Sequence, residues 1–330
     1  MLEQLPNADQ IEFKEKFVDR YSQLTNWNEF RKYSLSFLNR SIRINTLKGK
    51  VSEIKKNIEQ KGWELKPIPW CKEGFWVQGP MTEYKKDNKI EERNRRDVGN
   101  LLEHHLGQIY VQEAASMIPP LVLKPKPGEL VLDMCAAPGS KTTQMAAMMN
   151  NQGLLVANDV SGERLQALGI NLQRCGTTNT IIALGTGYRF KEGNFDRILV
   201  DAPCSATGTI MRSIKTIKMW NPKIVKHLCN IQKKLLETAW QNLKSGGTIV
   251  YSTCTLEPEE DEGVISWFLD KYPEAKLQEI KEKDLPGLKR SPAVLEFGKE
   301  KFNPEVKKCL RIWPQDNGTE GFFVTLLRKK

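Results

Sequence analysis

The pattern of hydrophobic and polar positions changes once along this 330-residue chain. In the first part, apolar residues spaced three and four apart predict helices over residues 8–39 and 51–62. Alternation over residues 41–47, and apolar runs at 63–68 and 75–78, predict strands that follow these helices. This mixture predicts a small α+β module.

From residue 107 onward, short apolar runs alternate with helical patterns, which is the order of a doubly wound α/β sheet. The expected strands cover residues 130–134, 153–159, 180–184, 195–200, 247–251 and 322–327. The expected helices cover residues 140–149, 162–174, 221–243 and 261–271. We therefore predict a helical and α+β region over residues 1–106, followed by a Rossmann-like sheet domain over residues 107–330.

The composition is that of a protein with an ordinary core, since 39% of the residues are hydrophobic. No apolar run approaches the roughly 20 residues that span a bilayer, and the first ten residues do not resemble a secretory signal. The seven cysteines include no Cys-x-x-Cys pair, and only three histidines accompany them, which argues against a zinc site or a disulfide framework. We therefore expect a cytoplasmic protein with no membrane segment and no metal.

The net charge is +10, and the excess lies toward both ends of the chain. Residues 1–100 contain 20 Lys and Arg against 15 Asp and Glu, and residues 281–330 contain 12 against 7. Residues 101–280 contain 18 of each. A polyanionic partner held by the flanks would explain this distribution, and so would a requirement for solubility alone.

A turn of small residues follows the first expected strand of the second region, at Asp133-Met-Cys-Ala-Ala-Pro-Gly-Ser-Lys-Thr142. Small residues let a ligand approach the backbone, and the helix that begins there offers unpaired N–H groups. The turn has neither Walker A nor Gly-x-Gly-x-x-Gly spacing. Asp159, at the end of the second strand, is placed to bind ribose hydroxyls. Together they predict an adenosine-containing cofactor, and a simple packing turn is the alternative.

Two cysteines follow two other strands, Cys204 in Asp201-Ala-Pro-Cys-Ser205 and Cys254 in Tyr251-Ser-Thr-Cys-Thr255. Because the carboxyl ends of neighbouring strands face one crevice in an open sheet, we expect both thiols and Asp201 to lie there. One thiol could attack a substrate and the other could help to release the product. A buried structural cysteine is the alternative for each thiol.

These motifs resemble the signature motifs of the Nop/Sun RNA (cytosine-5) methyltransferases. The resemblance runs from about residue 41 to the last residue of the sequence and implies S-adenosylmethionine (SAM) as the cofactor and RNA as the partner. It rests on residues 133–142, 201–208 and 252–255, and also on 43–48, 110–117, 311–314 and 321–323.

The resemblance also implies roles for individual residues. Cys254 would add to C6 of cytosine, which makes C5 nucleophilic, and Cys204 would take part in product release. Asp201 would bond the cytosine at N3, and Lys141 would support the base or the thiolate. The cofactor would lie against Cys135, Ala136, Ala137, Pro138, Gly139, Ser140, Lys141, Asp159, Arg164, Thr186 and Asp201.

Two positions depart from the family pattern. The family usually has an aspartate in place of Thr186, where it contacts the adenine amino group, whereas threonine offers an uncharged acceptor. The family commonly has asparagine in place of Asp261, so we expect the local hydrogen bonding to differ. Asp261 belongs to a carboxylate cluster that we expect at the N-terminal turn of a helix, where negative charge is favoured. The cluster consists of Glu257, Glu259, Glu260, Asp261 and Glu262.

The N-terminal region matches the position of an RNA-recognition-like module in the family. It lacks an evident aromatic signature, so we expect it to contact RNA shape and phosphates. The charged segment 84–100 is interpreted as a solvated loop, with an RNA-facing patch as the alternative. The target base must be flipped out of its stack to reach the crevice.

We predict a monomeric enzyme that methylates tRNA, because a compact member of the family suits that substrate. Ribosomal RNA is the second candidate. A catalytically weak RNA-binding protein on the same scaffold is a further alternative, supported by Thr186 alone. A DNA cytosine methylase attacks with the cysteine that follows a proline, which would leave the Cys254 motif unexplained.

Overall fold

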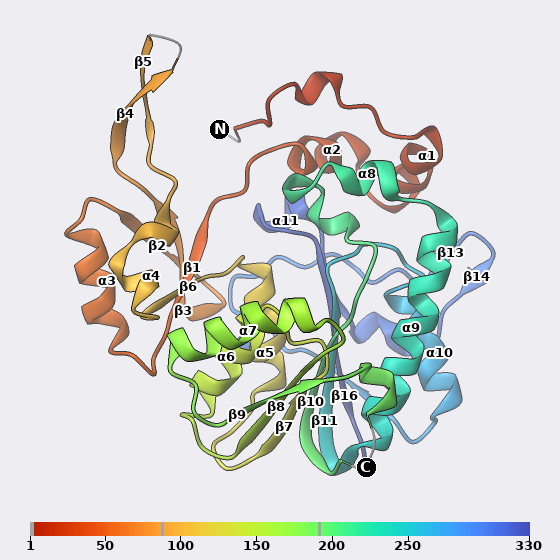
Figure 1. Cartoon of the computed structure of the whole chain (residues 1–330). Coiled ribbons are helices and arrows are strands. Elements are labelled where there is room, and N and C mark those ends of the chain that lie inside the picture. Colours follow the sequence, from red (N-terminus) through yellow and green to blue (C-terminus); the bar gives the residue numbers. More distant parts are fainter. Residues whose placement is uncertain (1–2, 87–88, 191–192) are drawn as a thin grey trace.

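The computed structural model describes residues 3–86, 89–190 and 193–330. The chain begins with short helices and continues into a small sheet with a helix against it (Figure 1). The helices of this region are η1 (Ala8–Gln10), α1 (Glu15–Leu24), α2 (Trp27–Ser34), α3 (Val51–Glu59), η2 (Val98–Asn100) and α4 (Leu102–His105). Its strands are β1 (Ser41–Ile44), β2 (Glu64–Ile68), β3 (Cys71–Gln78), β4 (Met81–Lys86), β5 (Lys89–Asn94) and β6 (Ile109–Val111).

Four of these strands form an antiparallel sheet in the order β2-β3-β1-β6. Ile42 and Ile44 of β1 share a buried cluster with Ile54 and Ile58 of α3, which is why the alternating and helical patterns meet here. The last strand, β6, lies beyond residue 106. The division of the chain at residue 106 stays a prediction.

Strands β4 and β5 form an antiparallel hairpin in which Met81 pairs with Asn94. The hairpin extends away from the small sheet (Figure 1). A solvated loop was expected over residues 84–100, and this expectation is wrong for the strand residues, because a two-stranded ribbon satisfies its backbone locally whatever its charge. The side chains of residues 84–93 lie outside the described set, so the RNA-facing patch stays a prediction.

Helices α1 and α2 pack on the large domain. Phe17 stacks on Tyr21 with ring centroids 4.1 Å apart. Trp220 meets Phe17 edge-on at 5.0 Å, and Trp313 meets Tyr21 edge-on at 6.2 Å. Such aromatic pairs contribute about 0.5–1.5 kcal/mol each beyond their burial, so these helices are firmly attached.

The large domain alternates strands and helices, as predicted. Its main strands are β7 (Leu130–Asp133), β8 (Leu154–Asp159), β9 (Thr180–Leu184), β10 (Phe195–Asp201), β11 (Leu243–Thr253), β12 (Lys276–Gln278), β15 (Leu310–Ile312) and β16 (Phe322–Arg328). Its α-helices are α5 (Ile118–Leu123), α6 (Ser140–Met148), α7 (Gly162–Cys175), α8 (Lys215–Met219), α9 (Pro222–Gln241), α10 (Glu262–Lys271) and α11 (Pro314–Asn317). Short elements complete it: η3 (Ala115–Met117), η4 (Gly187–Arg189), η5 (Thr207–Arg212), η6 (Glu282–Asp284), η7 (Pro304–Lys308), β13 (Glu296–Phe297) and β14 (Glu300–Lys301).

The large sheet has the order β12-β16-β11-β10-β7-β8-β9, with β15 paired to β16. The strands from β11 to β9 are parallel, whereas β16 and β12 are antiparallel additions at one side. Ile198 and Ile249 belong to the core cluster on the side of α9 and α10, while Leu199 and Val250 belong to the cluster on the side of α5 and α6. Helices therefore cover both faces, which confirms the predicted Rossmann-like fold. Among the described residues, no helix combines the length and the apolar character needed to cross a membrane.

Two buried polar residues join the small sheet to the large domain. Arg43 of β1 donates to Thr143 Oγ1 of α6 at 2.9 Å and to Gln112 Oε1 at 2.8 Å. Asn45 donates to the carbonyl of Cys175, at the end of α7, at 2.8 Å. Hydrogen bonds among buried groups are costly to break, so they hold the small sheet in one orientation.

Candidate active site

Two loops meet where β10 and β11 end. The two strands are parallel and place Asp201 beside Ser252, so the chain leaves both strands at the same edge of the sheet. Cys204 and Cys254 lie in the loops that follow, and their Sγ atoms are 3.3 Å apart. The structure thus brings the two predicted thiols together.

The two loops are also tied to each other. Ser205 and Thr207 place their hydroxyl oxygens 2.7 Å and 2.9 Å from Thr255 Oγ1, and the Gly208 N–H donates to the Cys254 carbonyl at 3.0 Å. A Cβ atom on Gly208 would lie 2.8 Å from that carbonyl oxygen and 2.4 Å from the Gly321 oxygen, so only glycine allows the loops to approach this closely.

The pKa values of the two thiols are shifted in opposite directions. The hydrogen bond with Cys204, helped by Lys141, lowers the pKa of Cys254 below its usual value. The same bond, together with burial, raises the pKa of Cys204 well above its usual value. These directions point to Cys204 as the S–H donor and Cys254 as the acceptor, although by geometry either sulfur could donate.

Lys141 and Asp201 form an ion pair next to the thiols, with Lys141 Nζ 2.7 Å from Asp201 Oδ2. Burial acts to lower the pKa of Lys141, but the Asp201 carboxylate outweighs it, so that pKa lies above its usual value. The other carboxylate oxygen of Asp201 accepts from the Ser252 hydroxyl at 2.7 Å. The ammonium group of Lys141 also lies 5.3 Å from the centre of the Phe322 ring.

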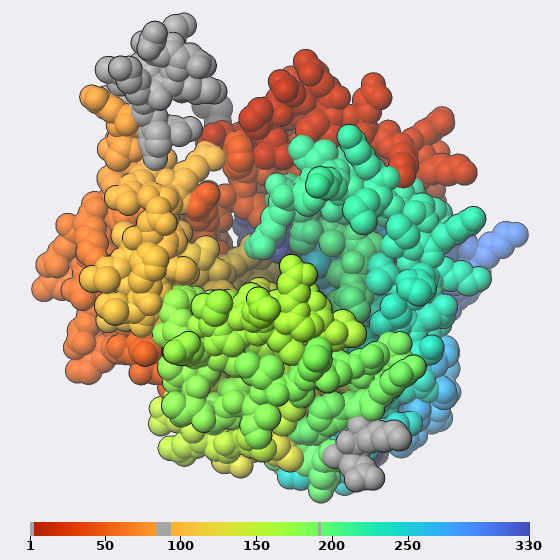
Figure 2. Space-filling model, in the orientation of Figure 1, coloured from red at the N-terminus to blue at the C-terminus, as the bar shows by residue number. Residues whose placement is uncertain are grey.

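A cavity of about 430 Å³ opens beside these groups. It lies in the recess at the centre of Figure 2, between the small sheet, α6 and the segment leading to α8. Five of its lining residues were predicted as site residues, namely Pro138, Ser140, Lys141, Asp201 and Cys254. The others are Tyr110, Val111, Gln112, Glu113, Ser116, Ala202, Thr209, Arg212, Glu320 and Phe322.

Sequence reasoning missed a charged group in this cavity. Glu320 is buried and pairs with Arg212, while Glu113 accepts from the Glu320 N–H at 3.2 Å. Burial raises the pKa of both Glu113 and Glu320. The contact between Glu113 and Glu320 joins residues 207 positions apart, so no local sequence pattern reveals it. The nearest signal is that Glu113 and Glu320 lie inside or beside motifs that carry the family resemblance.

The turn after β7 has the geometry of a ligand cradle. Gly139 has φ +104°, and a Cβ atom there would lie 2.8 Å from Leu168 Cδ1, so the turn requires glycine. Ala136 and Ala137 are buried, and Cys135 is half-buried beside them. Helix α6 begins at Ser140, where the first N–H groups of a helix have no partner within the helix.

Asp159 and Arg164 lie against this turn. The Asp159 carboxylate accepts from the backbone N–H of Ala137 and of Ser161, at 3.1 Å each. Arg164 pairs with Asp159 at 3.2 Å and donates to the Ala137 carbonyl. The structure therefore places both residues at the predicted turn, and their roles toward a cofactor stay predictions.

Thr186 lies in the loop that follows β9. Asn158 donates to the carbonyls of Met134 and Gly185, at 3.0 Å each, and so ties this loop to the turn after β7. Thr186 is half-buried and precedes η4. Its contact with an adenine ring stays a prediction.

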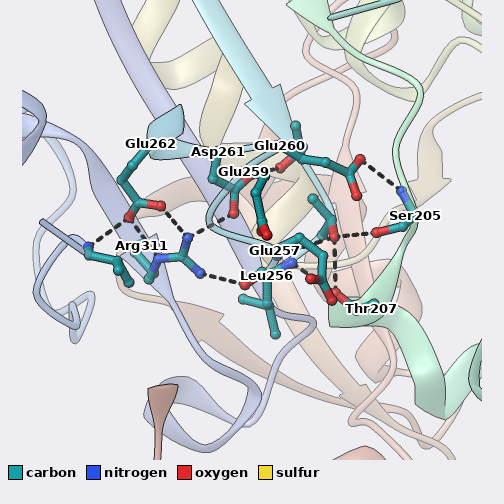
Figure 3. A network of polar contacts seen from close by, with 12 residues as sticks. Ser205, Thr207, Leu256, Glu257, Glu259, Glu260, Asp261, Glu262 and Arg311 are labelled. Carbon is teal, nitrogen blue, oxygen red and sulfur yellow. Dashed lines mark hydrogen bonds and ion pairs between the residues drawn. The ribbon is translucent and has the colours of Figure 1, made fainter. Parts of the chain in front are cut away.

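Four of the five carboxylates of the cluster are fully buried, namely Glu257, Glu260, Asp261 and Glu262. Helix α10 begins at Glu262 and Asp261 is its N-cap residue, so the predicted helix start is confirmed for these two residues. It is wrong for Glu257, Glu259 and Glu260, which precede the helix. Partners from distant segments satisfy the buried groups (Figure 3).

Two arginines neutralise most of this cluster. Arg311 is fully buried, contacts Asp261 at 2.9 Å and Glu262, and donates to the Leu256 carbonyl at 3.1 Å (Figure 3). Arg20 of α1 lies 2.7 Å from Glu257, which also accepts from Tyr21 and Trp220 at 2.8 Å each. Asp261 accepts in addition from the Thr253 hydroxyl at 2.5 Å, so the residue that departs from the family pattern is held by both a charge and a hydroxyl.

No arrangement of three or more His, Cys, Asp or Glu side chains suited to a metal ion occurs within residues 3–86, 89–190 and 193–330. The polar groups around the cavity include the thiol pair, the ion pair of Lys141 with Asp201, and the ion pair of Arg212 with the buried Glu320. This set can supply a nucleophile, a hydrogen-bond donor to that nucleophile, and groups that bind a polar ring.

Known proteins resemble the chain over nearly its full length. Residues 120–328 match the family described as 16S rRNA methyltransferase RsmB/F, and residues 13–114 match the N-terminal domain of 16S rRNA methyltransferase RsmF. A tRNA (cytosine(49)-C(5))-methyltransferase of Pyrococcus abyssi is 45% identical over 96% of this chain and 98% of that protein. Ribosomal RNA small subunit methyltransferase F of Shewanella amazonensis is 38% identical over 97% of this chain and 65% of that protein. A crystal structure of a methyltransferase homolog protein from Pyrococcus horikoshii superposes with a TM-score of 0.83 at 35% identity, covering 99% of this chain and 98% of that one.

Proposed function

The chain belongs to the RsmB/F (Nop/Sun) family of RNA cytosine-5 methyltransferases, and we propose that it methylates a cytosine of tRNA at C5. The support for tRNA is the extent of the match. The tRNA enzyme of Pyrococcus abyssi corresponds to this chain over nearly its whole length, whereas the ribosomal enzyme of Shewanella amazonensis has about a third of its length outside the match. Cytosine 49 is the first position to test.

The turn after β7 fits SAM as the cofactor. The small side chains and the glycine leave the backbone open, and Asp133 Oδ1 is buried without a hydrogen-bond partner, so it can accept from an ammonium group. Asp159 would bind the ribose hydroxyls, which requires Arg164 to give up its contact with that carboxylate. Thr186 would lie near the adenine. When bound, SAM supplies an electrophilic methyl group.

The thiolate of Cys254 would add to C6 of the flipped cytosine. The carbon–sulfur bond uses the thiolate electron pair, and the electrons of the C5–C6 double bond move toward N3 and O2, so that C5 becomes nucleophilic. Asp201, protonated by the ammonium group of Lys141 2.7 Å away, would donate a hydrogen bond to the ring at N3 and so stabilise the negative charge that develops there. Phe322, in the wall of the same cavity, offers an apolar surface to the base.

Release of the methylated base is an elimination. The C5 proton leaves to water, its bonding electrons restore the C5–C6 double bond, and the electrons of the C6–sulfur bond return to Cys254. Cys204, 3.3 Å from that sulfur, would donate its S–H to the departing thiolate and thereby make it a better leaving group. The same donor would stabilise the thiolate before attack.

The observation that carries this proposal is the 3.3 Å contact between the two thiols beside the cavity that Cys254, Lys141 and Asp201 line together. The test uses total tRNA from cells that lack this enzyme, with radiolabelled SAM. We expect Cys254→Ala to abolish methylation, and Cys204→Ala to leave a covalent protein–RNA adduct on a denaturing gel. Methylation by Cys254→Ala, or an adduct with that variant, would contradict the assignment.

Ribosomal RNA is the second substrate to test, because the family description and the Shewanella relative both name it. The same assay with 16S rRNA from those cells separates the two. Exclusive labelling of 16S rRNA would exclude tRNA as the substrate. A protein that binds tRNA but shows no SAM binding by calorimetry would instead be an RNA-binding protein on this scaffold.

A further inference from the structure

The loop that carries Cys204 has little support of its own. Residues 202–206 belong to no helix or strand, and Pro203 has no backbone N–H to donate. Ala206 has φ +57°, a left-handed conformation that alanine seldom adopts. Contacts from outside the loop must therefore fix its shape.

Two buried side chains hold this loop on both sides of Cys204. Gln232 of α9 donates from Nε2 to the Pro203 carbonyl at 2.9 Å, just before the thiol. Glu260 accepts from the Ser205 N–H at 3.1 Å, just after it. Gln232 Nε2 also donates to Glu260 Oε2 at 2.8 Å, so the two side chains form one clamp.

Glu260 differs from the other buried carboxylates of its cluster. Glu257 pairs with Arg20, and Asp261 and Glu262 pair with Arg311. Among the described residues Glu260 forms no ion pair, and its contacts are to neutral donors of Ser205 and Gln232 (Figure 3 shows the contact with Ser205). A buried carboxyl group without a cation is costly, which a purely structural position would avoid.

Cys254 has a support that the clamp does not provide. It directly follows β11, whose backbone pairs with β16 as far as Thr253. The contact of Ser205 with Thr255 joins the two loops, but no comparable strand pairing supports residues 202–206, so we expect loss of the clamp to move Cys204 more than Cys254. Glu260 also acts on the thiol through space, since its charge is among the causes that raise the pKa of Cys204 and keep it a donor.

We propose that Glu260 and Gln232 are positioning residues for Cys204, so that release of the methylated RNA depends on them at every pH, whereas the first methyl transfer does not depend on them once the pH is high enough for the Cys254 thiolate to form unaided. This inference rests on the proposed function. It assigns control over one step of the reaction to two residues that do not line the cavity.

The test uses Gln232→Leu and Glu260→Ala in the full chain, with total tRNA from cells that lack the enzyme. At pH 9, where attack no longer needs the hydrogen bond from Cys204, we expect methyl incorporation in the first turnover within about twofold of the wild-type level. We expect multiple-turnover rates at least tenfold lower and at least fivefold more covalent adduct on a denaturing gel. Adding Cys204→Ala to either variant should not increase the adduct further, because all three changes act on one step.

Glu257→Gln is the matched control, since it alters a buried carboxyl of the same cluster that contacts α1 and not the Cys204 loop. It should give adduct at the wild-type level. Should Glu260→Ala not fold, Gln232→Leu decides, because it changes a different element and keeps the side-chain size.

Two outcomes would overturn the inference while leaving the proposed function intact. One is wild-type turnover and adduct in Gln232→Leu, and the other is equal adduct accumulation in Glu257→Gln. If wild-type protein methylates no tRNA, or Cys204→Ala traps no adduct, the proposed function fails and this inference fails with it.

Discussion

Cys204 and Cys254 place their sulfur atoms 3.3 Å apart although 50 positions separate them in the sequence. The contact is short enough for a hydrogen bond, and the directions of the two pKa shifts favour the proton on Cys204. The two thiols thus form a donor–acceptor pair before any substrate binds. Each of the two residues affects the chemistry of the other.

This pair predicts a change in pH dependence. Attack needs the Cys254 thiolate, so the first-turnover rate should rise with pH through the pKa of that thiol. The hydrogen bond from Cys204 lowers that pKa, so Cys204→Ala should shift the acid limb of the rate profile to higher pH. Rapid-quench measurement of methyl incorporation from pH 5.5 to 9 tests this. An unshifted limb would mean that Cys204 does not tune the nucleophile.

The adenine side of the proposed cofactor site predicts a gain of affinity. Thr186→Asp introduces a charged acceptor where threonine has a neutral one, and charge-assisted hydrogen bonds are the stronger kind. We expect SAM to bind about fivefold more tightly, a gain of about 1 kcal/mol, as measured by calorimetry. Thr186→Asn controls for size without charge and should bind as the wild type does. Equal affinity in all three proteins would show that Thr186 lies away from the adenine.

The fully buried Arg311 predicts a large stability effect. Arg311→Met would leave Asp261 and Glu262 buried without their cation, which costs about 3–5 kcal/mol of unfolding free energy. Urea denaturation would measure this. Lys308→Met removes a nearby but more exposed ion pair with Glu305 and should cost less than about 0.5 kcal/mol. Similar losses in the two variants would contradict the geometry of the cluster.

Glu260 predicts a pH-dependent stability difference. Burial raises its pKa to about 7 in the folded protein, above the usual value of 4.5. The folded state therefore favours the protonated form, and stability falls as pH rises from about 4.5 through 7 and then levels off. Glu260→Gln lacks this charge. Between pH 4.5 and pH 8 the variant should gain stability relative to the wild type, by an amount on the order of 3 kcal/mol. Parallel stability curves for the two proteins would contradict this expectation.

The large sheet and the crevice could be predicted because their signals are local. The central strands contain apolar runs, Asp201 ends β10, Cys204 lies three residues after it, and Cys254 directly follows β11. The rule that parallel strands end at one edge then suffices to bring these residues together. Lys141, at the start of a helix that follows the neighbouring strand, joins them for the same reason.

The polar clusters could not be predicted in this way. A hydrophobic pattern assigns polar residues to the surface, yet Gln232 and Arg311 are fully buried. Gln232 meets Glu260 from 28 positions away, and Arg311 meets Asp261 from 50 positions away. Such partners become visible only when helices and strands are packed. For the same reason the sequence predicted a helix start for the carboxylates after Cys254 but not their buried partners.

Arg43 and Asn45 have a consequence for substrate choice. Suppose that the small sheet binds the same RNA whose cytosine enters the crevice. These buried hydrogen bonds then fix the distance between the RNA-binding surface of the small sheet and Cys254. This fixed distance would determine which cytosine of a folded RNA can reach the thiol. A cytosine would be selected by its distance from a fixed landmark, and the identity of its neighbours would matter little.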